Sequence, residues 1–184
     1  MIPQSFVRPG QQQGHEKKTT ESDEPTDHAL GRSRGGFGTK IHVICDNNGI
    51  PLAHVVSPGQ DHDNKFVREL LSRVSVRSDK PGRPRTRPKQ VNADKAYSAR
   101  NTRELLKKRG IRGNIPFKSN DKNRRWKFDK LGYRQRNIIE RLIGWTKEKR
   151  RIGTRYEKLA TTFSAMIDLS FVQRCFRVYL SDRA

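Results

Sequence analysis

The sequence is poor in apolar residues, in cysteine and in acidic residues. Apolar residues make up 32% of the 184 residues, and no apolar run approaches the roughly 18–20 residues that a membrane-spanning helix needs. The two cysteines, Cys45 and Cys175, lie in separate apolar runs, and no Cys or His spacing is typical of a zinc site. These absences argue against a membrane-spanning protein and a zinc protein. Two isolated cysteines without a signal peptide indicate a reducing compartment.

Basic side chains far outnumber acidic ones. Lys and Arg number 40 against 19 Asp and Glu, which gives a formal net charge of +21 and a pI near 10.7. Such a charge opposes a compact state by self-repulsion unless a polyanion neutralises it. The charge therefore indicates a nucleic-acid partner. It leaves three classes open: a nucleic-acid enzyme, a DNA-binding protein without catalysis, and an RNA-binding or ribosome-associated protein.

The chain divides into a short first segment and one domain. Residues 1–30 are polar and without periodicity, so we expect a poorly ordered segment in which only residues 5–8 resemble the stub of a strand. Residues 39–56 predict a β-hairpin, because residues 46–49 tolerate positive φ and separate two β-rich runs. We expect residues 31–184 to form the domain.

Alternating helix and strand patterns follow the hairpin. Apolar spacing predicts helices over 63–74, 100–109, 130–151 and 158–179, and short β-rich runs predict strands over 91–94 and 113–117. Asp61 and Asp63 are expected to cap the first helix, and Ser98 the second, which Gly110 ends. A hairpin followed by alternating helices and strands is typical of an α/β fold with a mixed sheet.

One narrow face of the predicted helix 130–151 gathers charged and phenolic side chains. On a wheel of about 100° per residue, four of them lie within about 40° of Glu140: Tyr133, Arg136, Lys147 and Arg151. A carboxylate surrounded by cations stays ionised, and such a face suits a site that holds a divalent metal and a phosphodiester together. The alternative is an amphipathic helix whose ion pairs, such as Arg136 with Glu140, only stabilise the helix.

The spacing on this helix resembles a known signature. Tyr133, Arg136, Glu140 and Lys147 match the Y–R–E–K pattern of insertion-sequence transposases with an Asp-Asp-Glu (DDE) catalytic triad. Three stretches resemble that family in the same order over most of residues 29–180: ALGRSRGGFGTKIHVICDNNGIPLAHVVSPGQDHD, VNADKAYSARNTRELLKKRGIRGNIP and RQRNIIERLIGWTKEKRRIGTRYEKLATTF. The resemblance implies a fold similar to ribonuclease H and retroviral integrases, in which helices flank a sheet that begins with an antiparallel three-strand meander.

The resemblance also implies a site and a reaction. Asp94 matches the second Asp of the triad and Glu140 matches the Glu, so both would be catalytic and would bind two divalent ions, Mg²⁺ or Mn²⁺. Tyr133, Arg136 and Lys147 would contact DNA, and the neighbouring Arg150 and Arg151 are expected to bind DNA as well. The implied function is that of a DNA transposase, a nucleotidyltransferase and endonuclease that cleaves phosphodiesters and transfers strands for DNA transposition and recombination.

The implied partners are double-stranded DNA, at the transposon ends and at the target, and further copies of the chain. The implied location is the bacterial cytoplasm, at the nucleoid. For Asp94 the sequence alone leaves a second interpretation, a turn or N-cap residue after a strand. Its position between a strand and a helix favours the site, because ligands gather beyond the C-terminal ends of strands in α/β sheets.

The sequence departs from the family where the first Asp of the triad is expected. That Asp should stand on the first strand just before residues 5–8, where this chain has Pro3, and the family's helical N-terminal region is not represented. We therefore expect a truncated copy whose two-carboxylate site binds a metal pair poorly. Asp46 (a turn residue), Asp61 and Asp63 are not expected to replace the missing acid. The alternative to an active transposase is a non-catalytic basic DNA-binding remnant.

Overall fold

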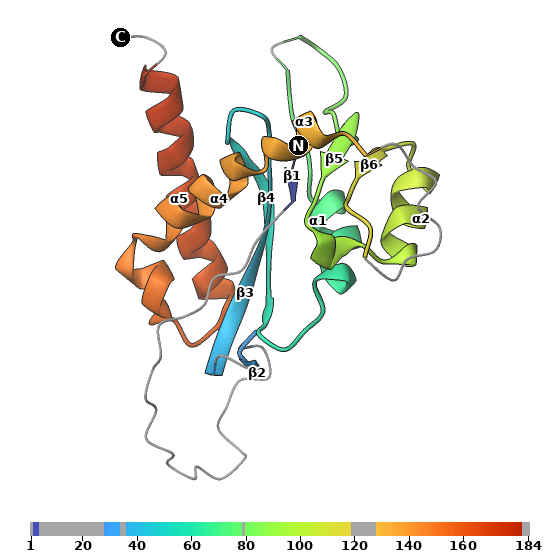
Figure 1. Ribbon diagram of the computed structural model, residues 1–184. Helices are drawn as coiled ribbons and strands as arrows, with labels where there is room; N and C mark the ends of the chain where they lie inside the picture. Colours follow the sequence, from blue (N-terminus) through green and yellow to red (C-terminus); the bar gives the residue numbers. More distant parts are fainter. Residues whose placement is uncertain (1, 4–27, 34–35, 79, 119–127, 182–184) are drawn as a thin grey trace. The chain divides into compact units, whose positions relative to one another are not determined.

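The computed structural model describes residues 2–3, 28–33, 36–78, 80–118 and 128–181 (Figure 1). The predicted strand stub at residues 5–8 lies outside them. The chain forms two compact units. The first comprises residues 1–5, 42–55 and 62–143, and the second comprises residues 6–41, 56–61 and 144–184.

The predicted hairpin is confirmed and contributes to both units. Strand β3 (Gly36–Cys45) pairs with strand β4 (Pro51–Pro58). In the turn, Oδ1 of Asp46 accepts the backbone N–H of Asn48 at 2.9 Å and that of Ile50 at 2.8 Å, while Gly49 has a φ of 76°. Asp46 is therefore the turn residue that its position predicts.

Two sheets contribute strands to the first unit. Strand β1 (Ile2–Pro3) pairs antiparallel with the end of β3, with Pro3 opposite Ile44, and also contacts β5 (Gln90–Asn92). Strand β5 pairs in parallel with β6 (Arg112–Asn114). One sheet thus has β3 paired with β1, β2 (Gly31–Ser33) and β4, and the parallel pair β5–β6 is a separate sheet whose β5 lies against β1. Antiparallel and parallel pairings in one unit confirm the mixed α/β class.

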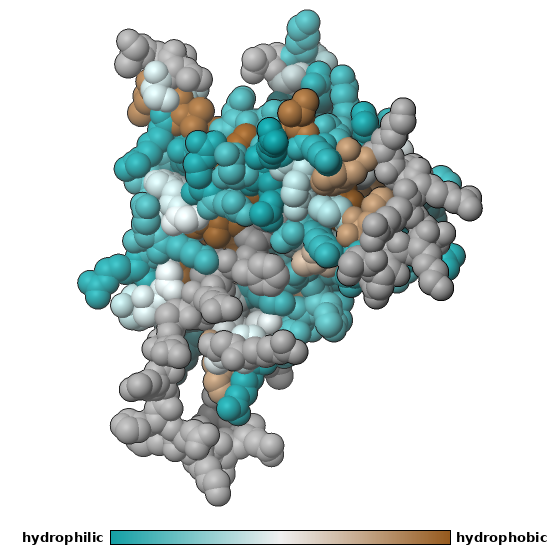
Figure 2. Space-filling view, viewed as in Figure 1, coloured by the Kyte–Doolittle hydropathy of each residue, from teal (hydrophilic) through white to brown (hydrophobic). Residues whose placement is uncertain are grey.

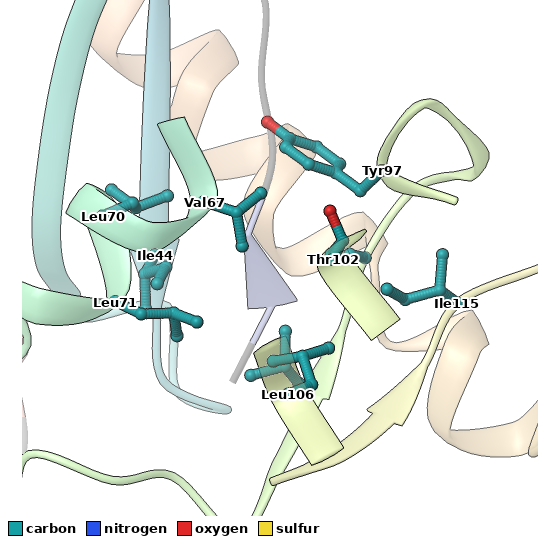
Figure 3. Close-up of a pocket in the computed structure, with 10 residues that line it drawn as sticks. Ile44, Val67, Leu70, Leu71, Tyr97, Thr102, Leu106 and Ile115 are labelled. Carbon is teal, nitrogen blue, oxygen red and sulfur yellow. The ribbon is translucent and has the colours of Figure 1, made fainter. Parts of the chain in front are cut away.

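Helices beside these strands enclose the apolar core of the first unit. The single turn η1 (Asp63–Phe66) continues into α1 (Val67–Ser72), and α2 (Arg100–Lys108) is followed by Gly110, whose φ is 63°. Side chains from β3, α1, β5, α2 and the segment after β6 surround a small internal gap (Figure 3): Ile44, Val67, Leu70, Leu71, Val91, Ala93, Tyr97, Thr102, Leu106 and Ile115. This core fixes the end of β5, beyond which Asp94 lies.

The N-cap predictions are wrong, whereas the predicted end of α2 at Gly110 is confirmed by its positive φ. The N-cap residue of η1 is His62, which makes no side-chain capping bond, and Asp63 is buried as the first helical residue. Ser98 ends the short turn η2 (Lys95–Tyr97), and the N-cap residue of α2 is Ala99, although α2 begins at Arg100 as predicted. The Ser98 hydroxyl instead accepts a hydrogen bond from Arg103 Nη2 at 2.9 Å.

The predicted continuous helix over 130–151 is also wrong. It is divided into α3 (Lys130–Arg134) and α4 (Asn137–Lys147), and a wide turn with π-type hydrogen bonding follows at Arg151–Arg155. At the first break the N–H of Arg136 donates to the carbonyl of Tyr133 at 3.0 Å. This hydrogen bond spans three residues, as in a 3-10 turn, where an α-helix spans four. Apolar spacing does not reveal this break, because α3 has no buried residue that would register a change of helical phase.

The second unit is built around the last helix. Helix α5 (Ala160–Ser181) confirms the helix predicted over 158–179, and β2 (Gly31–Ser33) pairs antiparallel with the start of β3. The buried guanidinium of Arg155 lies 4.8 Å from the Phe163 ring and donates to a ring of oxygen atoms: the carbonyls of His28, Ala29, Glu157 and Lys158 and the hydroxyl of Thr39. Arg155 thereby ties the segment before β2 to the start of α5.

Hydrophilic side chains dominate the face shown in Figure 2. The large apolar residues that remain exposed include a group on α5: Leu169, Val172, Phe176, Tyr179 and Leu180. Among the described residues, no helix combines the length and the apolar character needed to span a membrane.

Candidate active site

Asp94 lies just beyond the C-terminal end of β5, as predicted from the sequence. It is the N-cap residue of η2, and its Oδ1 accepts the backbone N–H of Lys95 at 2.6 Å. This bond fixes the carboxylate and leaves Oδ2 for other partners. The two sequence interpretations of Asp94 are therefore compatible, since one oxygen caps a turn and the other faces a cluster of charged side chains.

Arg136 joins Asp94 to Glu140. Its Nη2 lies 2.7 Å from Oε1 of Glu140, and its Nη1 lies 3.4 Å from Oδ2 of Asp94. The Arg136 side chain is 25% exposed, against 34% for Asp94 and 54% for Glu140. One guanidinium thus bridges an acid at the end of a strand and an acid on α4. The helical ion pair considered for Arg136 and Glu140 exists, but it is half of a wider arrangement.

Tyr133 completes this cluster from α3. The Arg136 guanidinium lies 5.5 Å from the centre of the Tyr133 ring. Burial is the largest effect on the pKa of Tyr133 and raises it, Arg136 opposes this, and the carboxylates of Asp94 and Glu140 raise it further. The phenol therefore stays protonated at neutral pH and can donate a hydrogen bond to an anion.

A buried amide clamp holds the start of α3 against the strand ends. The side-chain N–H of Asn114 donates to the carbonyl of Asp129 at 2.9 Å, and its Oδ1 accepts the N–H of Asp129 at 3.0 Å. Oδ1 of Asp129 then accepts the N–H of Gly132 at 2.9 Å, which caps α3. Asn114 also donates to Oδ1 of Asn92 at 2.8 Å, and Asn92 receives a second bond from Gln90.

Sequence reasoning missed this clamp. Asn92 and Asn114 are each the last residue of a strand, they are partners in the β5–β6 register, and both are buried. Two Asn residues at the ends of two predicted strands are the signal that could have found them, because a buried amide needs partners for all its polar atoms.

Four of the predicted site residues therefore lie together in the first unit: Asp94, Tyr133, Arg136 and Glu140. The other three belong to the second unit. Lys147 ends α4, Arg150 precedes the wide turn, and Arg151 opens that turn with its Nε 3.1 Å from Oε1 of Glu157.

The donor atoms in the first unit suit a hard divalent cation. Asp94 and Glu140 offer carboxylate oxygens, which Mg²⁺ and Mn²⁺ prefer, and both already converge on one positively charged group. Among the described residues, no group of three His, Cys, Asp or Glu side chains is positioned to hold a metal. The described part of the chain therefore supplies two carboxylates to this site, those of Asp94 and Glu140.

Fold and site together define a basic, mixed α/β protein in which a carboxylate beyond a parallel strand and a carboxylate on a helix share one arginine. Residues 91–177 match the family model described as a transposase DDE domain. A relative from Burkholderia cepacia, the transposase assigned to insertion sequence element IS402, is 30% identical over 139 residues. That alignment covers 76% of this chain and 63% of the relative. No solved structure matches the chain. Residues 91–177 thus resemble a transposase DDE domain, and the chain is similar to an insertion-sequence transposase over most of its length.

Proposed function

We propose that this chain acts in DNA transposition through metal-dependent cleavage of phosphodiesters and strand transfer. The observation that carries the proposal is the shared contact of Asp94 and Glu140 with one cationic group. Asp94, at a strand end, and Glu140, on a later helix, are far apart in the sequence, yet both contact Arg136. Because the chain spans 63% of the length of its Burkholderia relative, the activity of a whole transposase is part of the proposal.

A ribonuclease H-like catalytic domain over residues 31–184 is part of the same proposal. The antiparallel strands β1, β3 and β4 support it, together with the contact of β1 with β5, the first strand of the parallel pair β5–β6. The acids stand at the positions this fold requires, one just beyond β5 and one on a helix that follows β6. No solved structure adds support.

Asp94 and Glu140 would hold the divalent metal, Mg²⁺ or Mn²⁺. When bound, the metal would activate water or a DNA 3′-hydroxyl and stabilise the leaving oxygen. Arg136 and a divalent cation would compete for the same two carboxylates. When the cation neutralises Asp94 and Glu140, the Arg136 guanidinium becomes available to bind a phosphate of DNA. The protonated Tyr133 would donate a hydrogen bond to the DNA backbone. Lys147, Arg150 and Arg151 add phosphate contacts from the second unit.

The partners in this account are double-stranded DNA at the transposon ends and at the target, and further copies of the chain. The large excess of Lys and Arg over Asp and Glu supports a polyanionic partner. The place of action is then the bacterial cytoplasm at the nucleoid.

A second candidate is DNA binding without catalysis. It is favoured by the absence of a third metal-ligating side chain beside Asp94 and Glu140 among the described residues. Both candidates predict salt-dependent binding to duplex DNA, and they differ only in the need for the two carboxylates.

Nicking of supercoiled plasmid DNA in Mg²⁺ or Mn²⁺ distinguishes the two candidates. The catalytic proposal predicts metal-dependent nicking that Asp94→Asn and Glu140→Gln each abolish while DNA binding persists. Glu104→Gln is the matched control, because Glu104 is also paired with an Arg four residues away on an exposed helix face. Binding without metal-dependent nicking in the wild-type chain would leave the non-catalytic candidate.

A further inference from the structure

Three cations of the second unit surround one indole ring. The ring of Trp145, on α4, has Nζ of Lys149 4.0 Å from its centre. The guanidinium carbons of Arg177 and Arg174, both on α5, lie 5.8 Å and 6.0 Å from the same centre. A cation over an aromatic face is stabilised by the ring quadrupole, but one ring compensates three positive charges only in part.

In the part of the chain that the structure describes, none of these cations forms an ion pair with a carboxylate. Among the described residues, the further hydrogen bonds of Lys149 go to the hydroxyl of Ser170 at 2.9 Å and to its carbonyl at 3.5 Å. Nε of Arg174 is buried and has no hydrogen-bond partner in the described chain. Arg73, Arg100, Arg136 and Arg151, by contrast, each face a carboxylate.

The surroundings of Lys149 already oppose its charge. Burial is the larger cause that lowers the pKa of the Lys149 ammonium, and the positive charge of Arg177 lowers it further. An anion that enters the cluster would offset both effects, because an opposite charge nearby favours the charged form of Lys149. Clustered cations with an unpaired N–H cost free energy in the isolated protein, and a bound anion turns the same groups into ligands.

We propose that Trp145, Lys149, Arg174 and Arg177 form a phosphodiester-binding site that is made by residues other than the Asp94–Arg136–Glu140 cluster. The ligand is the backbone of duplex DNA. Arg174 and Arg177 offer planar guanidinium groups that can each hold two phosphate oxygens. Lys149 adds a point charge, and the indole shields one side from water. The geometry itself specifies only that the ligand is an anion. Its identity as DNA rests on the proposed function, in which duplex DNA is the partner.

The test measures the salt dependence of duplex DNA binding by the full chain. The double variant Lys149→Gln/Arg177→Gln should reduce the slope of log affinity against log salt by about 2, at about 0.9 per phosphate contact. Its affinity near physiological salt should fall about tenfold. The control variant Lys107→Gln/Lys108→Gln removes the same charge from an exposed face of α2, and it should change the slope by less than half as much.

A second measurement reports on the site directly. In a Trp126→Phe background, Trp145 is the remaining tryptophan, and its fluorescence should change when DNA binds, in proportion to occupancy. Arg177→Gln alone relieves like-charge repulsion, so the free chain should keep or gain thermal stability while DNA binding weakens. A purely structural cluster predicts the opposite, a loss of stability with DNA binding unchanged.

The outcomes separate this inference from the function on which it rests. If the wild-type chain binds DNA but the two double variants lose the same slope, or Trp145 fluorescence does not respond, the site is overturned and the proposed function stands. If the wild-type chain does not bind duplex DNA, the proposed function fails and the site fails with it.

Discussion

Asn114 holds the backbone of Asp129 at two points, with a donated bond of 2.9 Å to its carbonyl and an accepted bond of 3.0 Å from its N–H. This pairing imitates a β-bridge between a strand end and the residue that caps α3. The segment that begins there carries Tyr133 on α3, Arg136 in the turn before α4, and Glu140 on α4. A buried amide therefore sets where the charged cluster meets Asp94.

Replacement of Asn114 by Ala should therefore both destabilise the first unit and loosen the cluster. Two backbone groups of Asp129 lose their partners, which should cost about 2–3 kcal/mol in the free energy of unfolding. Urea denaturation measures this loss, and titration with Mn²⁺ measures the second effect, a weaker affinity in the protein that remains folded.

Thr102→Val is the control for Asn114→Ala. Thr102 is also buried in the first unit and donates to Oδ1 of Asn64 at 3.0 Å, so its loss should cost about 1 kcal/mol. Its Mn²⁺ affinity should stay unchanged. Equal losses of Mn²⁺ affinity in both variants would show that the amide clamp has no special part in positioning the acids.

Arg136→Gln should strengthen the binding of a divalent cation. The substitution removes the positive group that Asp94 and Glu140 share, and the two carboxylates then repel each other unless another cation joins them. A partly exposed ion pair is worth roughly 0.5–1 kcal/mol, so Mn²⁺ affinity should rise about threefold in calorimetric titration. Arg100→Gln, which breaks the exposed pair with Glu104, should leave it unchanged. Weaker Mn²⁺ binding in Arg136→Gln would mean that the guanidinium supports the metal site.

Pro3→Asp should add the acid that the family resemblance expects on the first strand. Pro3 lies on β1, opposite Ile44 of β3, and β1 contacts the strand that leads to Asp94. A third carboxylate on this strand is expected to raise Mn²⁺ affinity about tenfold, an increment of about 1.4 kcal/mol. Pro3→Asn, which has the same shape without the charge, should not. An equal gain in both variants would point to a strand effect.

The raised pKa of Tyr133 gives a dependence on alkaline pH. Because the folded chain holds the phenol protonated above its ordinary pKa of 10.0, the stabilisation is complete below that value and is lost as pH rises through the folded-state pKa. Ultraviolet titration of the folded chain should show late ionisation whose amplitude falls by one tyrosine in Tyr133→Phe. An unchanged amplitude in Tyr133→Phe would assign the shift to another residue.

Local sequence patterns predicted the parts of the fold that local physics determines. The hairpin is an example, since Asp46 and Gly49 form its turn with their own backbone and side-chain bonds. The position of Asp94 beyond a strand also followed from its neighbours. The break at Tyr133–Arg136 did not, because α3 has no buried residue that would register a change of helical phase.

The contacts that assemble the site are non-local and were harder to predict. The pair Arg136–Glu140 follows from helical spacing, but the contact of Arg136 with Asp94 depends on where α3 meets the end of β5. That placement comes from Asn92, Asn114 and Asp129, whose residue types are common in loops. The cation cluster at Trp145 likewise joins two helices that the sequence separates.

The central claim is that Asp94 and Glu140 act as one site for a divalent cation. A double-mutant cycle on Mn²⁺ affinity, with Asp94→Asn, Glu140→Gln and the double variant, tests it most directly. If both acids hold the same ion, each single substitution should cost nearly as much affinity as the double one, at least about tenfold. Additive effects, or single variants that bind Mn²⁺ as well as the wild-type chain, would contradict a shared site.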